Sequence, residues 1–314
     1  MKQSIDSREL FVLYGPDTAV RGTLHKTSAE RSGNPADRIE TDRVGVLFLN
    51  STSPTRAANG DTAVYLAESV AQRGYPSLRI DFPGFGDSGG DPPAGLNDYI
   101  NKGGFAAIAS AKIKELEMRF NLKGVVIVGH CAGAVSAIFA AAASEECRGL
   151  VLMGPYFHLP QSLKPLPRDP ASSRAASSQI TVDETSTEID NPEEKRHPSL
   201  AGEGLPDNAN VALLNCWKKV ASAGVPILLL KGPDRKASDA KLKAGEFDYL
   251  EYLLRSAGPR GQVTIKEVEG SNQAFANRQG RMAVRQETEE WLQAYFPLAA
   301  QTELDWSTVQ QETG

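Results

Sequence analysis

The chain has 314 residues, of which 40% are hydrophobic and 23% charged, and its formal net charge is −5. This is the composition of a globular protein with ample apolar material for a core. The negative balance gives no electrostatic reason to bind nucleic acid or an anionic membrane. No apolar run approaches the roughly 20 residues of a membrane-spanning helix, so we expect no membrane span.

The cysteine pattern and the N-terminal sequence indicate the cellular compartment of the protein. The first ten residues lack the apolar stretch of a secretory signal. The three cysteines, Cys131, Cys147 and Cys216, are an odd number and lack C-x-x-C spacing. That pattern argues against a disulfide framework and a zinc site, and it favours a reducing environment. We therefore expect a cytoplasmic protein without a metal or a cofactor.

Strand-like and helix-like segments alternate, which predicts a mostly parallel sheet with helices on both faces. In the first half we expect a hairpin of residues 10–14 and 19–25, a buried strand over 44–49, a helix over 63–73, a strand over 76–81 and a helix over 105–120. In the second half we expect strands over 149–153, 227–230 and 263–268 and helices over 247–256 and 282–295.

One long segment interrupts this alternation. Residues 160–208 are rich in Pro, Ser, Asp and Glu and poor in large apolar residues, so they cannot bury enough surface to offset their ordering entropy. The segment leaves the C-terminal edge of the sheet, where ligands of α/β proteins bind, which favours a lid. We therefore expect a core of residues 1–155 and 211–298, a lid or flexible insertion at 156–210 and a polar tail at 299–314.

The most informative motif is Gly129-His130-Cys131-Ala132-Gly133. It follows the apolar run 125–128 and precedes the alanine-rich helical pattern 134–143. Strand, sharp turn and helix are the context of a G-x-S-x-G nucleophile elbow, here with a cysteine at its tip. The helix N-terminus should favour a thiolate. The alternative is a small buried cysteine in an inactive elbow.

Three further motifs carry a resemblance: R-I-D-F-P-G-F-G-D-S at 79–88, L-K-G-P-D at 230–234 and E-G-S-N-Q-A-F at 269–275. With the elbow, they make the chain resemble the serine-aminopeptidase-like group of the α/β-hydrolase superfamily, in particular the small hydrolases associated with exosortase systems. The resemblance runs from about residue 44 to 296. It implies an α/β-hydrolase fold, with a mostly parallel eight-stranded sheet, helices on both faces and a lid insertion.

The family implies a nucleophile, an acid and a histidine, in that order along the chain. Cys131 matches the nucleophile, and Asp234, in the loop after an apolar strand, matches the acid. Gln273 stands where the family has its histidine. An amide accepts no proton near neutral pH, so Gln273 either binds a substrate carbonyl or a water, or is a relic of lost activity. Without an imidazole to orient, Asp234 could also be an exposed loop residue.

Histidines elsewhere could supply the missing base. His130 is expected to pack behind the nucleophile. His158 follows the strand beside the elbow strand by five residues, a reach of at most about 18 Å, and is a candidate substitute base, as is His197 in the lid. The oxyanion hole would use the N–H of Ala132 and a second N–H from the turn after Leu49, at Asn50 or Ser51.

These residues favour an acyl-processing enzyme. Cys131 would attack an ester or thioester of a small-molecule or carrier-bound acyl substrate, and acyl transfer, condensation or cyclisation, or slow hydrolysis would follow. The alternatives are a non-catalytic binding protein with an α/β-hydrolase-like fold and a catalyst that uses the same pocket without a covalent step. The glycine pattern at 84–89 is followed by prolines rather than a helix, so it predicts no dinucleotide cofactor.

Overall fold

An eight-stranded sheet forms the centre of the protein in its computed structural model, which describes residues 8–14, 19–27, 43–50, 55–159, 204–232, 247–272 and 274–298. The strands are β1 (Arg8–Tyr14), β2 (Ala19–His25), β3 (Gly45–Leu49), β4 (Ser77–Ile80), β5 (Val125–His130), β6 (Cys147–Met153), β7 (Pro226–Lys231) and β8 (Gln262–Glu267). Their order is β1-β2-β4-β3-β5-β6-β7-β8, and only the β1–β2 and β2–β4 pairings are antiparallel. The predicted eight-stranded, mostly parallel sheet is confirmed.

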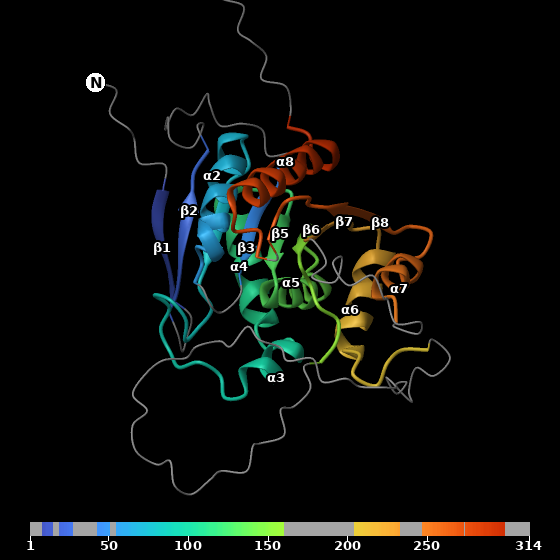
Figure 1. Ribbon diagram of the computed structural model, residues 1–314. Coiled ribbons are helices and arrows are strands. Elements are labelled where there is room, and N and C mark those ends of the chain that lie inside the picture. Colours follow the sequence, from blue (N-terminus) through green and yellow to red (C-terminus); the bar gives the residue numbers. More distant parts are fainter. Residues whose placement is uncertain are drawn as a thin grey trace, which may run out of the picture.

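Helices cover both faces of the sheet (Figure 1). One face packs against α2 (Thr62–Gln72) and α8 (Arg278–Tyr295), and a 3₁₀ turn, η2 (Asn59–Asp61), precedes α2. The other face packs against α3 (Leu96–Asn101), α4 (Ala106–Phe120), α5 (Ala132–Ala143), α6 (Val211–Ser222) and α7 (Tyr249–Ser256).

The central strand β3 shows why its sequence forms a strand of this kind. Leu47 and Leu49 belong to the core under α4 and α5, whereas Val46 and Phe48 belong to the core under α2 and α8. All four side chains are fully buried. Because successive side chains of a strand point to opposite faces, a sheet covered on both faces requires this unbroken apolar run.

Two helices of the structure, α3 and α6, are not among the elements predicted from the sequence. Helix α6 begins after Asn210, whose side-chain oxygen accepts a hydrogen bond from the N–H of Leu213 at 3.1 Å. Its buried face includes Leu213, Trp217 and Val220, the spacing of one side of an amphipathic helix. The capping asparagine and this spacing are both visible in the sequence, so the helix was predictable.

The predicted lid boundaries stay a prediction, since residues 160–203 lie outside the described part of the chain, as does the predicted tail at 299–314. The two flanks that are described lie together. His158 pairs with Ala209 in an isolated antiparallel bridge, and the N–H of Leu159 donates to the carbonyl of Asn208 at 2.7 Å. Phe157 and Leu205 are buried in the core, so the chain around the insertion is held to the body of the protein.

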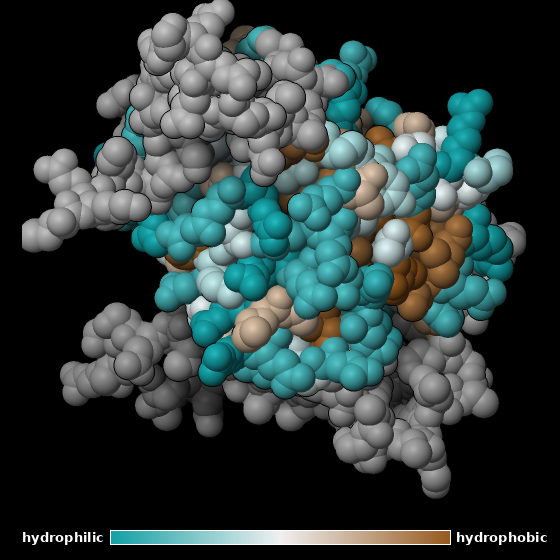
Figure 2. Space-filling model, turned by 90° about the horizontal axis from the view of Figure 1, so that it is seen from above, coloured by the Kyte–Doolittle hydropathy of each residue, from teal (hydrophilic) through white to brown (hydrophobic). Residues whose placement is uncertain are grey.

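One face of the protein is largely polar over its described residues. Figure 2 shows a mostly hydrophilic face, in which apolar residues gather in small areas. Among the described helices, none is both long enough and apolar enough to cross a membrane.

Helix α5 lies very close to the neighbouring strands, because two glycines leave no side chain between them. A Cβ atom on Gly129 would lie 2.5 Å from the Cα of Ala134, and one on Gly133 would overlap the carbonyl oxygen of Leu49. Approaches of this kind are a main use of glycine. They bring the start of α5 directly against the ends of β3 and β5.

We predict that Gly133→Ala destabilises the protein by about 3 kcal/mol, because the added methyl group must displace the main chain of β3. Gly204→Ala is the matched control: Gly204 has a φ of +65° but open space around its Cα, so that substitution costs only about 1 kcal/mol of backbone strain. Urea unfolding of both variants measures the difference. Equal losses of stability would contradict the close contact.

Candidate active site

Cys131 occupies a strained turn between β5 and α5. Its φ of 50° and ψ of −116° lie in a region that L-residues with a side chain rarely adopt. Hydrogen bonds hold it there: its N–H donates to the carbonyl of Met153 at 2.9 Å, and its carbonyl accepts from the N–H groups of Ala134 and Val135 at 2.9 and 3.2 Å. This is the strand–turn–helix geometry that the sequence predicts for a nucleophile elbow.

Cys131 is a partly exposed residue, and its sulfur has a histidine next to it. The side chain of Cys131 is half-buried, and its Sγ lies 3.5 Å from Nε2 of His130. Burial raises the pKa of the Cys131 thiol, and this opposes the stabilisation of a thiolate by the N-terminus of α5. The resting group is therefore a neutral thiol, in contrast to the thiolate expected from the helix N-terminus.

His130 combines a structural position with a contact to the sulfur. It is 3% exposed, and its ring stands edge-on to the ring of Phe275 with 6.0 Å between their centres. Burial lowers the pKa of His130 to about 4, so the imidazole is neutral at pH 7. The sequence predicts that His130 packs behind the nucleophile, but it does not predict the contact between Nε2 of His130 and Sγ of Cys131. Because burial raises the pKa of the Cys131 thiol and lowers that of His130, complete proton transfer from the thiol to this imidazole is uphill before any substrate binds.

The loop after β8 approaches the elbow on the side of Phe275. Gln273 itself lies outside the described residues. Its neighbours are fixed: the side-chain oxygen of Asn272 accepts from the N–H of Ala276 at 2.7 Å, and the side-chain amide of Asn277 donates to the carbonyl of Gly270 at 2.7 Å. Since Phe275 packs against His130, the residue two positions after Gln273 lies beside the elbow.

Only some of the other predicted site residues lie within the described part of the chain. Asp234 and Ser51 lie outside the described residues, as does His197, so their predicted roles stay predictions. His158 is exposed and lies in the bridge to Ala209. Ala132 is the first residue of α5, and an α-helix leaves the N–H groups of its first turn without internal partners. Within the described chain, His130 is the side chain hydrogen-bonded to Sγ.

Sequence reasoning missed Tyr156, which lies near the sulfur. The residue follows β6 by three positions and is half-buried, and its ring centre lies 6.1 Å from that of His158. Burial, and then the negative charge that Cys131 would carry as a thiolate, raise the pKa of Tyr156. Because β6 lies beside β5, a tyrosine soon after β6 was a visible signal of proximity to the elbow.

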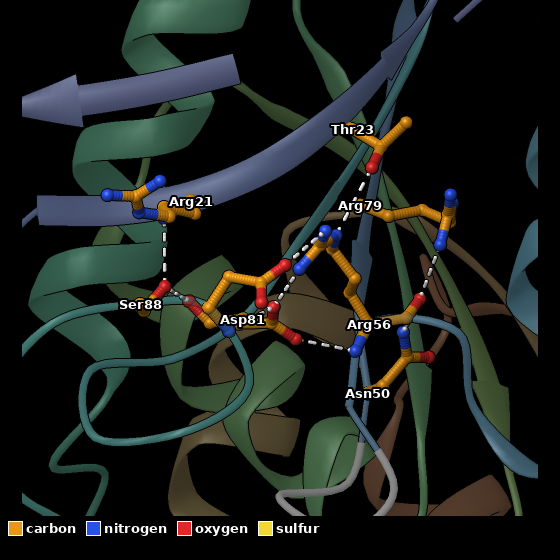
Figure 3. A network of polar contacts seen from close by, with 8 residues as sticks. Arg21, Thr23, Asn50, Arg56, Arg79, Asp81 and Ser88 are labelled. Atoms are coloured by element: carbon orange, nitrogen blue, oxygen red, sulfur yellow. Dashed lines mark hydrogen bonds and ion pairs between the residues drawn. The ribbon is translucent and has the colours of Figure 1, made fainter. Parts of the chain in front are cut away.

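Sequence reasoning also missed a polar network around Asp81, the first aspartate of the motif at 79–88 (Figure 3). Its carboxylate pairs with Arg56, from the loop between β3 and α2. Ser88, of the same motif, accepts from the N–H of Arg21 and donates to the carbonyl of Asp81, each at 2.8 Å. As for metals, the described residues contain no group of three or more His, Cys, Asp or Glu side chains that could hold an ion.

A sheet of this order with a strained residue at a strand–helix elbow defines an α/β protein of the hydrolase type. Residues 46–277 match the model of the alpha/beta hydrolase family, and the chain belongs to this family. No curated protein matches it in sequence. The likeness to the serine-aminopeptidase-like group and to exosortase-associated hydrolases stays a prediction.

Similar solved structures include an esterase of Pyrococcus furiosus, with 15% identity, a TM-score of 0.57 and coverage of 92% of this chain and 91% of that one. The dienelactone hydrolase of Anabaena variabilis has 16% identity, a TM-score of 0.51 and coverage of 92% and 99%. The ferulic-acid-bound Est1E of Butyrivibrio proteoclasticus has 14% identity, a TM-score of 0.52 and coverage of 89% and 98%. At these identities the likeness establishes the fold.

The lowered pKa of His130 predicts acid sensitivity. The unfolded chain, with a histidine pKa near 6.5, binds more protons than the folded protein between pH 6.5 and 4, so stability falls as the pH drops through that window. For His130 the loss between pH 7 and pH 5 is about 2 kcal/mol. Urea unfolding of the wild type and of His130→Gln at both pH values measures it. Between pH 7 and pH 5 the free energy of unfolding of the wild type should fall by about 2 kcal/mol more than that of the variant. Equal losses would contradict the lowered pKa of His130.

Proposed function

We propose that the protein is an acyl-processing enzyme in which the sulfur of Cys131 attacks the carbonyl carbon of an ester or thioester. One observation carries the proposal: a partly exposed cysteine at a strained elbow, with its sulfur 3.5 Å from the ring nitrogen of a neutral histidine. A nucleophile within hydrogen-bond reach of a base is the signature of covalent catalysis. Membership of the alpha/beta hydrolase family supports it.

The first step forms a thioester on the enzyme. As the sulfur–carbon bond forms, the thiol proton passes to Nε2 of His130 and the carbonyl electron pair moves to oxygen. The N–H of Ala132, with a second donor from the turn after Leu49, would stabilise that oxyanion. When the intermediate collapses, the bond to the leaving alkoxide or thiolate breaks, and the leaving group takes the proton from His130. An imidazolium whose pKa is about 4 is a strong donor for this last transfer.

The fate of the acyl group follows from the chemistry of the site. A thioester substrate suits it, since one thiolate replaces another and no poor leaving group must depart. His130 serves the sulfur in the first step, whereas the base that activates water in the family is the histidine at whose place Gln273 stands. Because an amide cannot replace that second base, acyl transfer, or condensation or cyclisation onto a better nucleophile, is faster than hydrolysis. The substrate class is a small-molecule or carrier-bound acyl ester or thioester.

A second candidate is a binding protein of this fold that does not carry out the reaction. The raised pKa of the Cys131 thiol favours it, because burial keeps the sulfur in its less nucleophilic form. A third, the non-covalent catalyst, requires activity that does not depend on Cys131. One experiment separates all three.

We predict that the wild-type protein gains one acyl group when mixed with short acyl thioesters of N-acetylcysteamine, as measured by time-resolved intact mass. Cys131→Ala gains none. His130→Gln is acylated about 10²–10⁴-fold more slowly, because it lacks the base. Cys216→Ala, which removes another partly exposed thiol, is the control and keeps the wild-type rate.

Other outcomes identify the alternatives. An unchanged mass together with a rise in melting temperature on adding the thioester would support the binding protein. Equal turnover by the wild type and Cys131→Ala would support the non-covalent catalyst. Either result contradicts the proposal.

We predict that Gln273→His increases hydrolytic turnover of an activated ester by about 10²-fold or more, since a general base contributes about that much. Gln279→His makes the same chemical change in α8 and is the matched control. The assay is release of 4-nitrophenol from the acetate ester. A Gln273→His variant no faster than the control would show that position 273 does not face the reacting carbon.

A further inference from the structure

Phe275 is a buried aromatic residue in a strained conformation. Its φ of 54° lies in the left-handed region, which a residue with a bulky side chain rarely adopts, and its side chain is fully buried. A conformation of this kind persists only where the surrounding structure holds it, and such residues cluster at functional sites. The contacts of Phe275 therefore indicate what its conformation serves.

Hydrogen bonds hold the main chain of Phe275 on both sides. Its N–H donates to the carbonyl of Asn272 at 2.9 Å, and the N–H of the next residue, Ala276, donates to the side-chain oxygen of Asn272 at 2.7 Å. The hydroxyl of Thr62 donates to the carbonyl of Phe275 at 3.3 Å and to that of Asn59 at 2.7 Å. These bonds join Phe275 to the start of α2.

Two glycines let the neighbouring elements close in on this stretch. A Cβ atom on Gly60, in η2, would lie 2.6 Å from the carbonyl oxygen of Ala276, and one on Gly280, in α8, would lie 3.2 Å from the Cα of Phe275. The main chain of Phe275 and Ala276 is therefore packed between the start of α2 and the start of α8. It cannot relax to a common conformation without moving one of these helices.

The ring of Phe275 is held against the elbow. It stands at 71° to the ring of His130, with 6.0 Å between their centres, a favourable edge-to-face arrangement. A Cβ atom on Gly154 would lie 3.8 Å from a carbon of the same ring. Phe275 also belongs to the buried cluster that includes Met153 and Leu230, at the ends of β6 and β7. The strained residue therefore delivers its ring to the imidazole beside the sulfur.

Packing orients the imidazole of His130. Within the described chain, its hydrogen-bond contact is the one from Nε2 to Sγ of Cys131, at 3.5 Å. A base beside a nucleophile usually has a third group that hydrogen-bonds the other ring nitrogen and fixes the orientation of the ring. In the described part of this protein, the aromatic ring that contacts His130 is that of Phe275.

We propose that Phe275 is the positioning residue of His130. Its strained main chain holds the aromatic ring against the imidazole and so keeps Nε2 turned toward Sγ of Cys131. Edge-to-face packing thus performs the task that a hydrogen-bonded carboxylate performs in a catalytic triad. This inference rests on the proposed function, in which His130 takes the proton of the thiol.

A double-mutant cycle tests this role. Phe275→Leu removes the ring but keeps a buried apolar side chain and the same backbone strain. With a thioester of N-acetylcysteamine, it should be acylated about 10²-fold more slowly than the wild type, as expected when a catalytic group moves by about 1 Å. In the His130→Gln background, where no imidazole needs to be held, Phe275→Leu should slow acylation by less than about threefold. Equal slowing in both backgrounds would overturn the inference.

Two further variants control for folding. Phe275→Met fills more of the space of the ring than leucine does, and it should show the same dependence on His130 if Phe275→Leu does not fold. Phe296→Leu makes the same chemical change just after α8, where the ring of Phe296 stands edge-on to that of Trp291 with 5.7 Å between their centres. It should leave the acylation rate unchanged in both backgrounds.

The ring contact can be measured in the wild type by NMR spectroscopy. Nuclear Overhauser effects should connect the ring protons of His130 to those of Phe275, and their absence would overturn the inference whatever the activity.

Failure of the inference and failure of the proposed function look different. If the wild type is acylated and the Phe275 variants are acylated at the same rate, the inference is wrong and the proposed function stands. A wild type that shows the ring contact but is never acylated at Cys131 overturns the proposed function, and the positioning role of Phe275 with it.

Discussion

The contact between the start of helix α5 and the ends of β3 and β5 is the constraint on which the site depends. Gly129 and Gly133 permit it, and a side chain at either position would overlap the opposite main chain. Because the helix starts so close to the strand, the chain must reverse at Cys131 with a φ of 50°. The sulfur, the N–H of Ala132 and Asn50, the residue after β3, therefore meet at one junction. The hydrogen bond from the N–H of Cys131 to the carbonyl of Met153 helps to offset the strain.

Two opposing electrostatic effects act on the sulfur at this junction. The N-terminus of α5 favours a thiolate, and burial favours the thiol and raises its pKa. The neighbouring imidazole, with a pKa of about 4, does not form an imidazolium at rest. The neutral thiol and imidazole are therefore favoured over a thiolate–imidazolium pair, and in the proposed reaction the proton leaves the sulfur as the bond to carbon forms. Under that proposal the site favours substrates with an activated carbonyl, which is the physical basis for preferring thioesters.

The sequence was sufficient for the sheet and the elbow. The apolar run of β3 and the order of glycines around Cys131 each have one structural solution in an α/β protein. The contact of His130 with Sγ was harder to foresee. Neighbouring residues of a strand point to opposite faces, and only the left-handed turn at Cys131 brings the two side chains together. Arg56, the partner of Asp81, lies 25 residues away in the loop between β3 and α2. No local sequence pattern identifies it.

Mapping the acyl group to a residue tests the central claim most directly. The protein would be mixed with a carbonyl-¹³C acyl thioester, quenched in acid, digested and sequenced by tandem mass spectrometry. The chain has three cysteines, Cys131, Cys147 and Cys216, on which a label could form a thioester. The account predicts the label on the peptide that contains Cys131, and there alone. A label on Cys216, or an enzyme that consumes the thioester with no labelled peptide at any time, would contradict it.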